Sequence, residues 1–230
     1  MLIVNNLSFS YGEVQALRNI NIDVPKEQIV SIMGRNGVGK TTLMKNIVGL
    51  LKPSIGTITL ENQGIEKLPA HQRIRVGIGY VPQGRMIFPK LTVNENLRIG
   101  LFGRQNGKVI PDEILDLFPI LQEMHNRMGG DLSGGQQQQL AIARALVTDP
   151  KILILDEPTE GIQPNIIQQI GQILTELVKQ RNMTILIVEQ YLDFVREFCQ
   201  HFYVMNRGEI VANAETEDLT QEIVKEYLSV

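Results

Sequence analysis

Short apolar runs alternate along the chain with segments in which apolar residues recur at helical spacing. Two of the runs, residues 29–33 and 152–155, are continuous and apolar, which is typical of strands buried inside a parallel sheet. A helix is predicted to begin at Pro164, because proline suits the first helical position, and another strand covers residues 183–188. The apolar face of that helix comprises Ile166, Ile170, Ile173, Leu174 and Leu177. Strands that alternate with helices in this way predict an α/β fold with a mostly parallel sheet.

The first 33 residues and the middle of the chain depart from this alternation. Near the N-terminus, short apolar runs are broken by Asn, Gly or Pro, which predicts a β-rich part. These runs are residues 2–4, 7–9, 20–24 and 29–33, and residues 57–60 and 77–82 are predicted as further strands. Apolar residues recur at helical spacing between Ile114 and Leu121. We therefore expect one domain, residues 1–230, with a core of residues 1–83 and 146–230 and an inserted helical subdomain at about 84–145.

Composition narrows the class of protein. A length of 230 residues with 43% hydrophobic content suits one α/β domain. The net charge of -3 argues against a nucleic-acid partner, and the single cysteine, Cys199, excludes a disulfide within the chain. There is no apolar run of 18 residues and no N-terminal pattern of a signal peptide. A membrane role would therefore require partners.

A phosphate-binding loop follows the first buried strand. Residues 34–41 match G-x-x-x-x-G-K-[ST], and they lie between a predicted strand and a predicted helix. This arrangement directs backbone N–H groups and a helix N-terminus at one anion. We expect Lys40 to neutralise the β- and γ-phosphates of ATP and the hydroxyl of Thr41 to bind Mg²⁺. The candidate ATP-binding residues here are Gly34, Arg35, Asn36, Gly37, Val38, Gly39, Lys40, Thr41 and Thr42.

Two acidic residues end the buried strand at residues 152–155. Asp156 is placed to hold Mg²⁺ together with Thr41, since Mg²⁺ needs few carboxylates beside waters and phosphate oxygens. Glu157 follows it and can polarise a water for attack on the γ-phosphate. Taken alone, two acids at the end of a strand could equally be solvated surface residues. Because the same chain also has a phosphate-binding loop, an ATP-hydrolysing site is favoured.

A third segment gives the chain a family resemblance. It comprises Leu132, Ser133, Gly134, Gly135 and Gln136. With this LSGGQ signature, the chain resembles the ATP-binding subunits of ATP-binding-cassette (ABC) transporters over nearly its whole length. The resemblance implies the ABC ATPase fold: a RecA-like P-loop core, an N-terminal antiparallel β part and an inserted helical subdomain. It also implies that the signature of one subunit closes over the phosphate-binding loop of a second cassette, so that two subunits share two sites.

Two further positions match the family. Gln83 falls at the Q-loop, where its amide would touch Mg²⁺ and the attacking water. Tyr11 matches the aromatic residue that stacks on adenine, although a tyrosine taken singly is more often a core or edge aromatic.

Two positions depart from the family. Gln190 stands where most members have a switch histidine, and a glutamine can donate a hydrogen bond but cannot pass a proton as imidazole does. We therefore expect hydrolysis to depend on Glu157. Gln163 stands where the D-loop commonly has aspartate, which puts signalling between subunits through a carboxylate in doubt.

The strings VEQY, EPTEGIQP and YVPQGRMIFPKLTVNENL resemble importers of branched-chain amino acids, and more closely those of urea and short amides. Urea is the expected solute, with branched-chain amino acids as the second candidate. The resemblance further implies a second cassette, permease subunits, an extracellular or periplasmic binding protein, and a peripheral position on the cytoplasmic face of a bacterial inner membrane. The motifs would also suit a soluble ABC ATPase without a transport role, or a nucleotide-binding regulator that has lost hydrolysis.

Residues 84–91 are a candidate contact for the permease. Their apolar side chains, Met86, Ile87 and Phe88, are flanked by Arg85 and Lys90. They could form a groove for a cytoplasmic helix, or they could be ordinary core of the helical subdomain.

Overall fold

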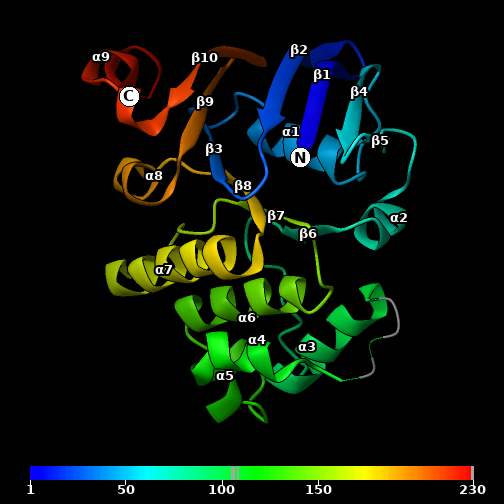
Figure 1. The fold of residues 1–230 in the computed structure, drawn as a ribbon, viewed down its shortest axis with the longest axis vertical. Helices are drawn as coiled ribbons and strands as arrows, with labels where there is room; N and C mark the ends of the chain where they lie inside the picture. The colour runs from blue at the N-terminus through cyan, green and yellow to red at the C-terminus, as the bar shows by residue number, and fades with distance from the viewer. Residues whose placement is uncertain (105–106, 108, 229–230) are drawn as a thin grey trace.

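A six-stranded sheet forms the centre of the molecule (Figure 1). The computed structural model describes residues 1–104, 107 and 109–228. The strand order is β10-β9-β3-β8-β7-β6, and all neighbours are parallel except the β10–β9 pair at one edge. The strands are β3 (Ile29–Met33), β6 (Ile78–Val81), β7 (Ile152–Asp156), β8 (Thr184–Val188), β9 (His201–Asn206) and β10 (Glu209–Glu215).

A second, antiparallel sheet is built from the N-terminal part in the order β2-β1-β4-β5. Its strands are β1 (Leu2–Tyr11), β2 (Val14–Val24), β4 (Ile55–Leu60) and β5 (Gln63–Gly64). The two predicted runs at residues 2–4 and 7–9 are one strand. The polar pair between them does not end it, because Asn6 adopts a φ of 51° and the register shifts between Val4 and Leu7.

Some helices pack on the six-stranded sheet, and others form a further layer below them (Figure 1). In the figure, α3 to α6 lie on the far side of α7 from the strands. The α-helices are α1 (Lys40–Ile47), α2 (Ala70–Arg75), α3 (Val93–Gly100), α4 (Asp112–Leu117), α5 (Pro119–Glu123), α6 (Gly134–Leu146), α7 (Pro164–Arg181), α8 (Leu192–Phe198) and α9 (Gln221–Ile223). The shorter turns are η1 (Leu101–Gly103), η2 (Gly129–Asp131), η3 (Thr216–Asp218) and η4 (Val224–Leu228).

The helical spacing between Ile114 and Leu121 corresponds to two short helices. Phe118 leaves the helical conformation, with φ -131° and ψ 68°, and Pro119 begins α5. A residue before proline is pushed away from helical geometry by the proline ring, which explains the break. Among the described residues, no helix is long and apolar enough to cross a membrane.

The central sheet is buried on both faces, which explains why its strands are continuously apolar. Residues of β3 alternate between two hydrophobic cores. Ile29 and Met33 pack with the helices α6 and α7, whereas Val30 and Ile32 pack with α1 and the N-terminal sheet. The carboxyl ends of the parallel strands lie at one edge, and the loops after β3, β6, β7 and β8 bring Lys40, Gln83, Glu157 and Gln190 together there.

Candidate nucleotide-binding site

The loop between β3 and α1 requires glycine at two positions. Gly34 has a φ of 149°, and a Cβ atom there would overlap the carbonyl oxygen of Met205. Gly39 has a φ of 112°, and its Cβ atom would lie 3.0 Å from the carbonyl oxygen of Ala16. Only glycine fits both the backbone and the space. The loop is therefore shaped by its neighbours β2 and β9 as well as by its own sequence.

Lys40 lies buried at the start of α1, and its side chain folds back onto the phosphate-binding loop. Its Nζ donates to the carbonyl oxygens of Gly34 at 2.7 Å and Arg35 at 2.9 Å, and lies 3.7 Å from Oε1 of Glu157. Burial lowers the pKa of the Lys40 ammonium, while the carboxylates of Glu157 and Asp156 act in the opposite direction. The lysine thus has hydrogen-bond partners that an incoming phosphate can replace.

Asp156 is a buried carboxylate for which the described residues supply no hydrogen bond of good geometry. It ends β7 with 1% exposure, and the hydroxyls of Thr41 and Tyr80 lie near its Oδ atoms without meeting hydrogen-bond geometry. Burial raises the pKa of the Asp156 carboxyl to about 6, with Thr41 and Lys40 counteracting. An unsatisfied buried carboxylate is costly unless it meets a cation. These oxygens, with the Thr41 hydroxyl, are the hard donors that Mg²⁺ prefers, so the residues fit this ion.

The carboxylate of Glu157 accepts hydrogen bonds from two glutamine amides. Nε2 of Gln190 lies 2.6 Å from Oε1 of Glu157 and 2.7 Å from Oδ1 of Asn36. Nε2 of Gln83 lies 2.9 Å from Oε2 of Glu157 and 3.1 Å from Oε2 of Glu160. The three residues predicted as catalytic, from the loops after β6, β7 and β8, therefore meet at one carboxylate.

A cavity of about 720 Å³ opens onto this network. Tyr11 lines it with its ring half exposed, and Phe9 meets that ring edge-on at a centroid distance of 4.8 Å. The ring therefore lies at the cavity and outside the core. The other residues that line the cavity are Val14, Gln15, Ala16, Arg18, Asn36, Gly37, Val38, Gly39, Lys40, Thr41, Thr42, Gln83, Glu157, Arg207 and Gly208.

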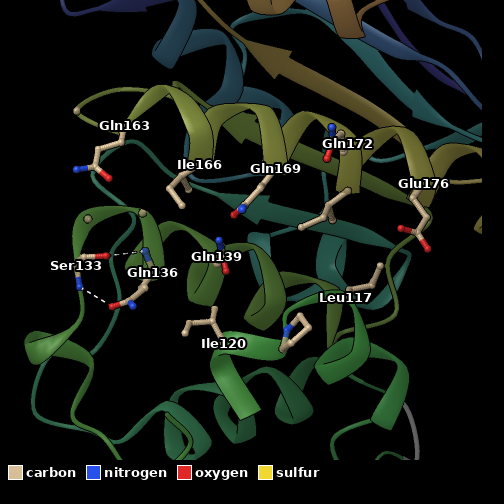
Figure 2. Close-up of a pocket in the computed structure, with 15 residues that line it drawn as sticks. Leu117, Ile120, Ser133, Gln136, Gln139, Gln163, Ile166, Gln169, Gln172 and Glu176 are labelled. Carbon is tan, nitrogen blue, oxygen red and sulfur yellow. Dashed lines mark hydrogen bonds between the residues drawn. The ribbon is translucent and has the colours of Figure 1, made fainter. Parts of the chain in front are cut away.

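The signature segment lines a second cavity, of about 860 Å³, between α6 and α7 (Figure 2). Ser133 precedes α6 and caps it: its Oγ accepts from the Gln136 N–H at 3.4 Å, and its own N–H donates to Oε1 of Gln136 at 2.9 Å. Gln163 lies across the cavity from Ser133, near the start of α7. The two cavities share no lining residue. Within one chain, the signature and the phosphate-binding loop are therefore separate.

One residue of the site was not singled out from the sequence. Glu189 is 2% exposed and accepts backbone N–H bonds from both the loop after β7 and its own loop; burial raises its pKa. An acid directly after a continuous apolar strand is the signal that could have found it. Arg85, which flanks the candidate permease contact, also approaches the site, because its guanidinium donates to the carbonyl oxygen of Glu160 at 3.2 Å.

The segment after Gln83 is only partly buried. Met86 is 67% exposed and Phe88 is 44% exposed, whereas Ile87 packs against the core of the helical layer. Arg144 fixes the segment by donating to the carbonyl oxygen of Met86 at 2.9 Å and by lying 5.3 Å over the Phe88 ring. Two of the three apolar side chains are therefore at the surface of the isolated chain.

Comparison with known proteins agrees with this geometry. A family model described as "ABC transporter" matches residues 17–160. The high-affinity branched-chain amino acid transport ATP-binding protein BraG of Pseudomonas aeruginosa is 40% identical over 92% of this chain and 91% of its own length. The lipopolysaccharide export system ATP-binding protein LptB of Haemophilus influenzae is 34% identical over 99% of this chain and 97% of its own length.

A solved structure gives the same result at the level of the fold. The dimeric ATP-binding cassette MJ0796, in a post-hydrolysis state bound to ADP and Pi, superposes with a TM-score of 0.84 at 29% identity, covering 94% of this chain and 99% of its own. The family model spans more than half of the chain, and the fold is that of ABC ATPase cassettes. The chain therefore belongs to the ABC transporter family, as an ATP-binding subunit that hydrolyses ATP.

Proposed function

We propose that this chain drives a bacterial ABC importer of a small polar solute by binding and hydrolysing MgATP. The observation that carries the proposal is the meeting of Gln83, Glu157 and Gln190 beside Lys40, at the mouth of a cavity shaped by the phosphate-binding loop. Positioning and charge stabilisation are what phosphoryl transfer requires of a protein.

In this proposal, each residue of the loop acts on the phosphates. Lys40 exchanges the carbonyl oxygens of Gly34 and Arg35 for oxygens of the β- and γ-phosphates. Backbone N–H groups between Gly37 and Thr42 hold the same oxygens, and Tyr11 stacks on adenine. Asp156, with Thr41 and Gln83, would hold Mg²⁺, which when bound neutralises phosphate charge.

Glu157 takes the role of general base. Its carboxylate lies between two amides that fix its orientation, and it can accept a proton from an attacking water. Gln190 contributes a hydrogen bond but no proton transfer, because an amide does not titrate. Proton transfer in this site is therefore assigned to Glu157 alone.

A second cassette completes the site. Ser133, Gly134, Gly135 and the N-terminus of α6 would meet the γ-phosphate bound by the partner, because within one chain they line a different cavity. MgATP then favours the closed pair, and hydrolysis releases it. The partner cassette is a copy of this chain or a related one.

Coupling to permease subunits is proposed through residues 84–91, with the chain peripheral to the cytoplasmic face of the membrane. The exposure of Met86 and Phe88 supports this contact. Hydrogen exchange at 84–91 should become protected when the chain is purified with its permease. Unchanged exchange there would contradict the contact.

Two solutes remain in this proposal. The name of BraG favours branched-chain amino acids, whereas the sequence strings favour urea or short amides. The likeness to LptB, named for lipopolysaccharide export, indicates that a cassette alone does not define the solute. An extracellular or periplasmic binding protein and the permease would select it.

Uptake of labelled urea and labelled leucine by native cells carrying Lys40→Ala tests the proposal. Loss of leucine uptake alone assigns the chain to a branched-chain amino acid importer, and loss of urea uptake alone assigns it to a urea importer. If neither falls and no membrane subunit co-purifies, a soluble ABC ATPase replaces the importer.

A further inference from the structure

Glu189 is a carboxylate buried where two loops of the site meet, and none of the roles proposed above uses it. It is 2% exposed and lies between the end of β8 and Gln190. Burying a charge is costly unless hydrogen bonds compensate for the lost water. The partners of this carboxylate therefore indicate what it does.

The Glu189 carboxylate accepts three backbone N–H bonds. Oε1 accepts from Thr159 at 3.0 Å, and Oε2 accepts from Gln190 at 3.0 Å and from Tyr191 at 3.3 Å. Thr159 follows Glu157 by two residues. One side chain thus joins the loop after β7, which carries Glu157, to the loop after β8, which carries Gln190.

The backbone around Glu189 extends the connection to β3, the strand that precedes the phosphate-binding loop. Its N–H donates to the carbonyl oxygen of Ile32 at 3.2 Å, near the end of β3, and the N–H of Glu157 donates to Val188 at 2.9 Å. The parallel pairing of β7 with β8 ends at Asp156 and Val188. Beyond that point, the Glu189 carboxylate takes the next available N–H, that of Thr159, and continues the contact between the loops.

We propose that Glu189 is a positioning residue for ATP hydrolysis: it holds the loops after β7 and β8 so that the Gln190 amide meets the Glu157 carboxylate. The proposal rests on the roles proposed above for Glu157 and Gln190. A carboxylate suits the position, because it has only acceptors and two oxygens that serve three donors. A glutamine would turn an NH₂ group toward one of these N–H groups, and an aspartate is one methylene too short to span both loops.

Hydrogen exchange of the full chain tests the connection directly. In Glu189→Gln, hydrogen exchange at the backbone amides of Thr159, Gln190 and Tyr191 should become faster by about tenfold or more. Each amide loses its hydrogen-bond acceptor or lies in a loop that is held less firmly. The control is Asp193→Asn, which removes an exposed acid in the first turn of α8 and should leave these amides unchanged. Unchanged exchange at Thr159 in Glu189→Gln would overturn the proposal.

A double-mutant cycle tests whether Glu189 acts through Gln190. At saturating MgATP, kcat of Glu189→Gln should fall by about tenfold or more, with KM within roughly threefold of wild type. The double variant with Gln190→Ala should be no slower than Gln190→Ala alone, since the positioned group is already absent. If the fold-losses in kcat of the two single variants multiply in the double variant, Glu189 acts independently of Gln190. That result would indicate a general structural role and would overturn the proposal.

Glu157→Gln separates this proposal from the one on which it rests. If Glu157→Gln turns over MgATP at the wild-type rate, the catalytic assignment fails. If Glu157→Gln is inactive but the losses at Glu189 and Gln190 multiply, only the positioning role of Glu189 fails.

Discussion

At the scale of single residues, the site combines carboxylates in opposite circumstances. Asp156 is buried without a hydrogen bond of good geometry from the described residues, whereas Glu157 has two amide donors and a neighbouring ammonium group. The first arrangement would suit the binding of a cation, and the second would orient Glu157 for its proposed role as a base. Asp156 and Glu157 are adjacent in the sequence, but their different environments suit them to different chemistry.

Glu157→Gln should lower MgATP hydrolysis by roughly a hundredfold or more, because the variant cannot accept a proton. MgATP binding should persist, so the variant should accumulate as an ATP-bound pair of cassettes, detectable by light scattering. Glu123→Gln, at an exposed position in α5, serves as a control with wild-type turnover. A Glu157→Gln chain that stays monomeric and hydrolyses ATP normally would contradict the assigned role.

The raised pKa of Asp156 predicts a specific pH dependence. The folded chain holds this proton up to about pH 6, whereas the unfolded chain releases it near pH 4. Between these values the folded state binds more protons, so this group destabilises the metal-free fold as pH rises through about 4 to 6. Nucleotide binding that depends on Mg²⁺ should instead weaken as pH falls below 6, because protonation removes the ligand.

Asp156→Asn checks this pair of effects. Without Mg²⁺ at pH 7, the variant should raise the free energy of unfolding by about 1–3 kcal/mol, measured by urea denaturation, because a buried charge is gone. The same variant should lose the gain in ATP affinity that Mg²⁺ gives the wild type. A variant that is less stable than wild type without Mg²⁺ would contradict the account.

At the scale of elements, how well the sequence predicts structure depends on how local the signal is. The helix at Pro164 is confirmed, since proline acts within its own turn. The continuity of β1 across Asn6 depends on pairing with two other strands, β2 and β4, so residues 2–9 alone suggest two runs. The positions of the site motifs follow from sequence, but the hydrogen bonds that join Gln83, Glu157 and Gln190 come from separate loops and required the fold.

The close packing between α7 and α8 depends on a glycine, Gly171, in α7. A Cβ atom on Gly171 would overlap the ring of Phe198, so α8 lies directly on the α7 backbone. Gly171→Ala should lower the free energy of unfolding by about 1–3 kcal/mol, although alanine is the better helix former. Gln180→Ala, at an exposed position of α7, should change it by less than about 0.5 kcal/mol in the same denaturation experiment.

At the scale of the whole molecule, the separation of the two cavities is the main functional consequence of the fold. The phosphate-binding loop and the signature lie on cavities with no lining residue in common. In the proposed function, a second cassette would bring both to one nucleotide.

Mixing two inactive variants tests this requirement. Lys40→Ala and Ser133→Ala should each hydrolyse ATP at a small fraction of the wild-type rate. If two copies of the chain pair, the mixture contains dimers in which one site has both an intact Lys40 and an intact Ser133, and activity should return in part. Activity that stays absent while the chain elutes as a pair of identical copies would contradict a site shared between subunits.

The phosphate-binding loop is also held by residues that lie far from it in the sequence. Gly208 donates its N–H to the carbonyl oxygen of Val38, and Gly34 rests against Met205. During synthesis, residues 34–42 leave the ribosome long before these two supports exist. The nascent chain therefore acquires a shaped nucleotide site only after residues 205–208 have emerged, so ATP can stabilise chains that include these residues and not shorter ones.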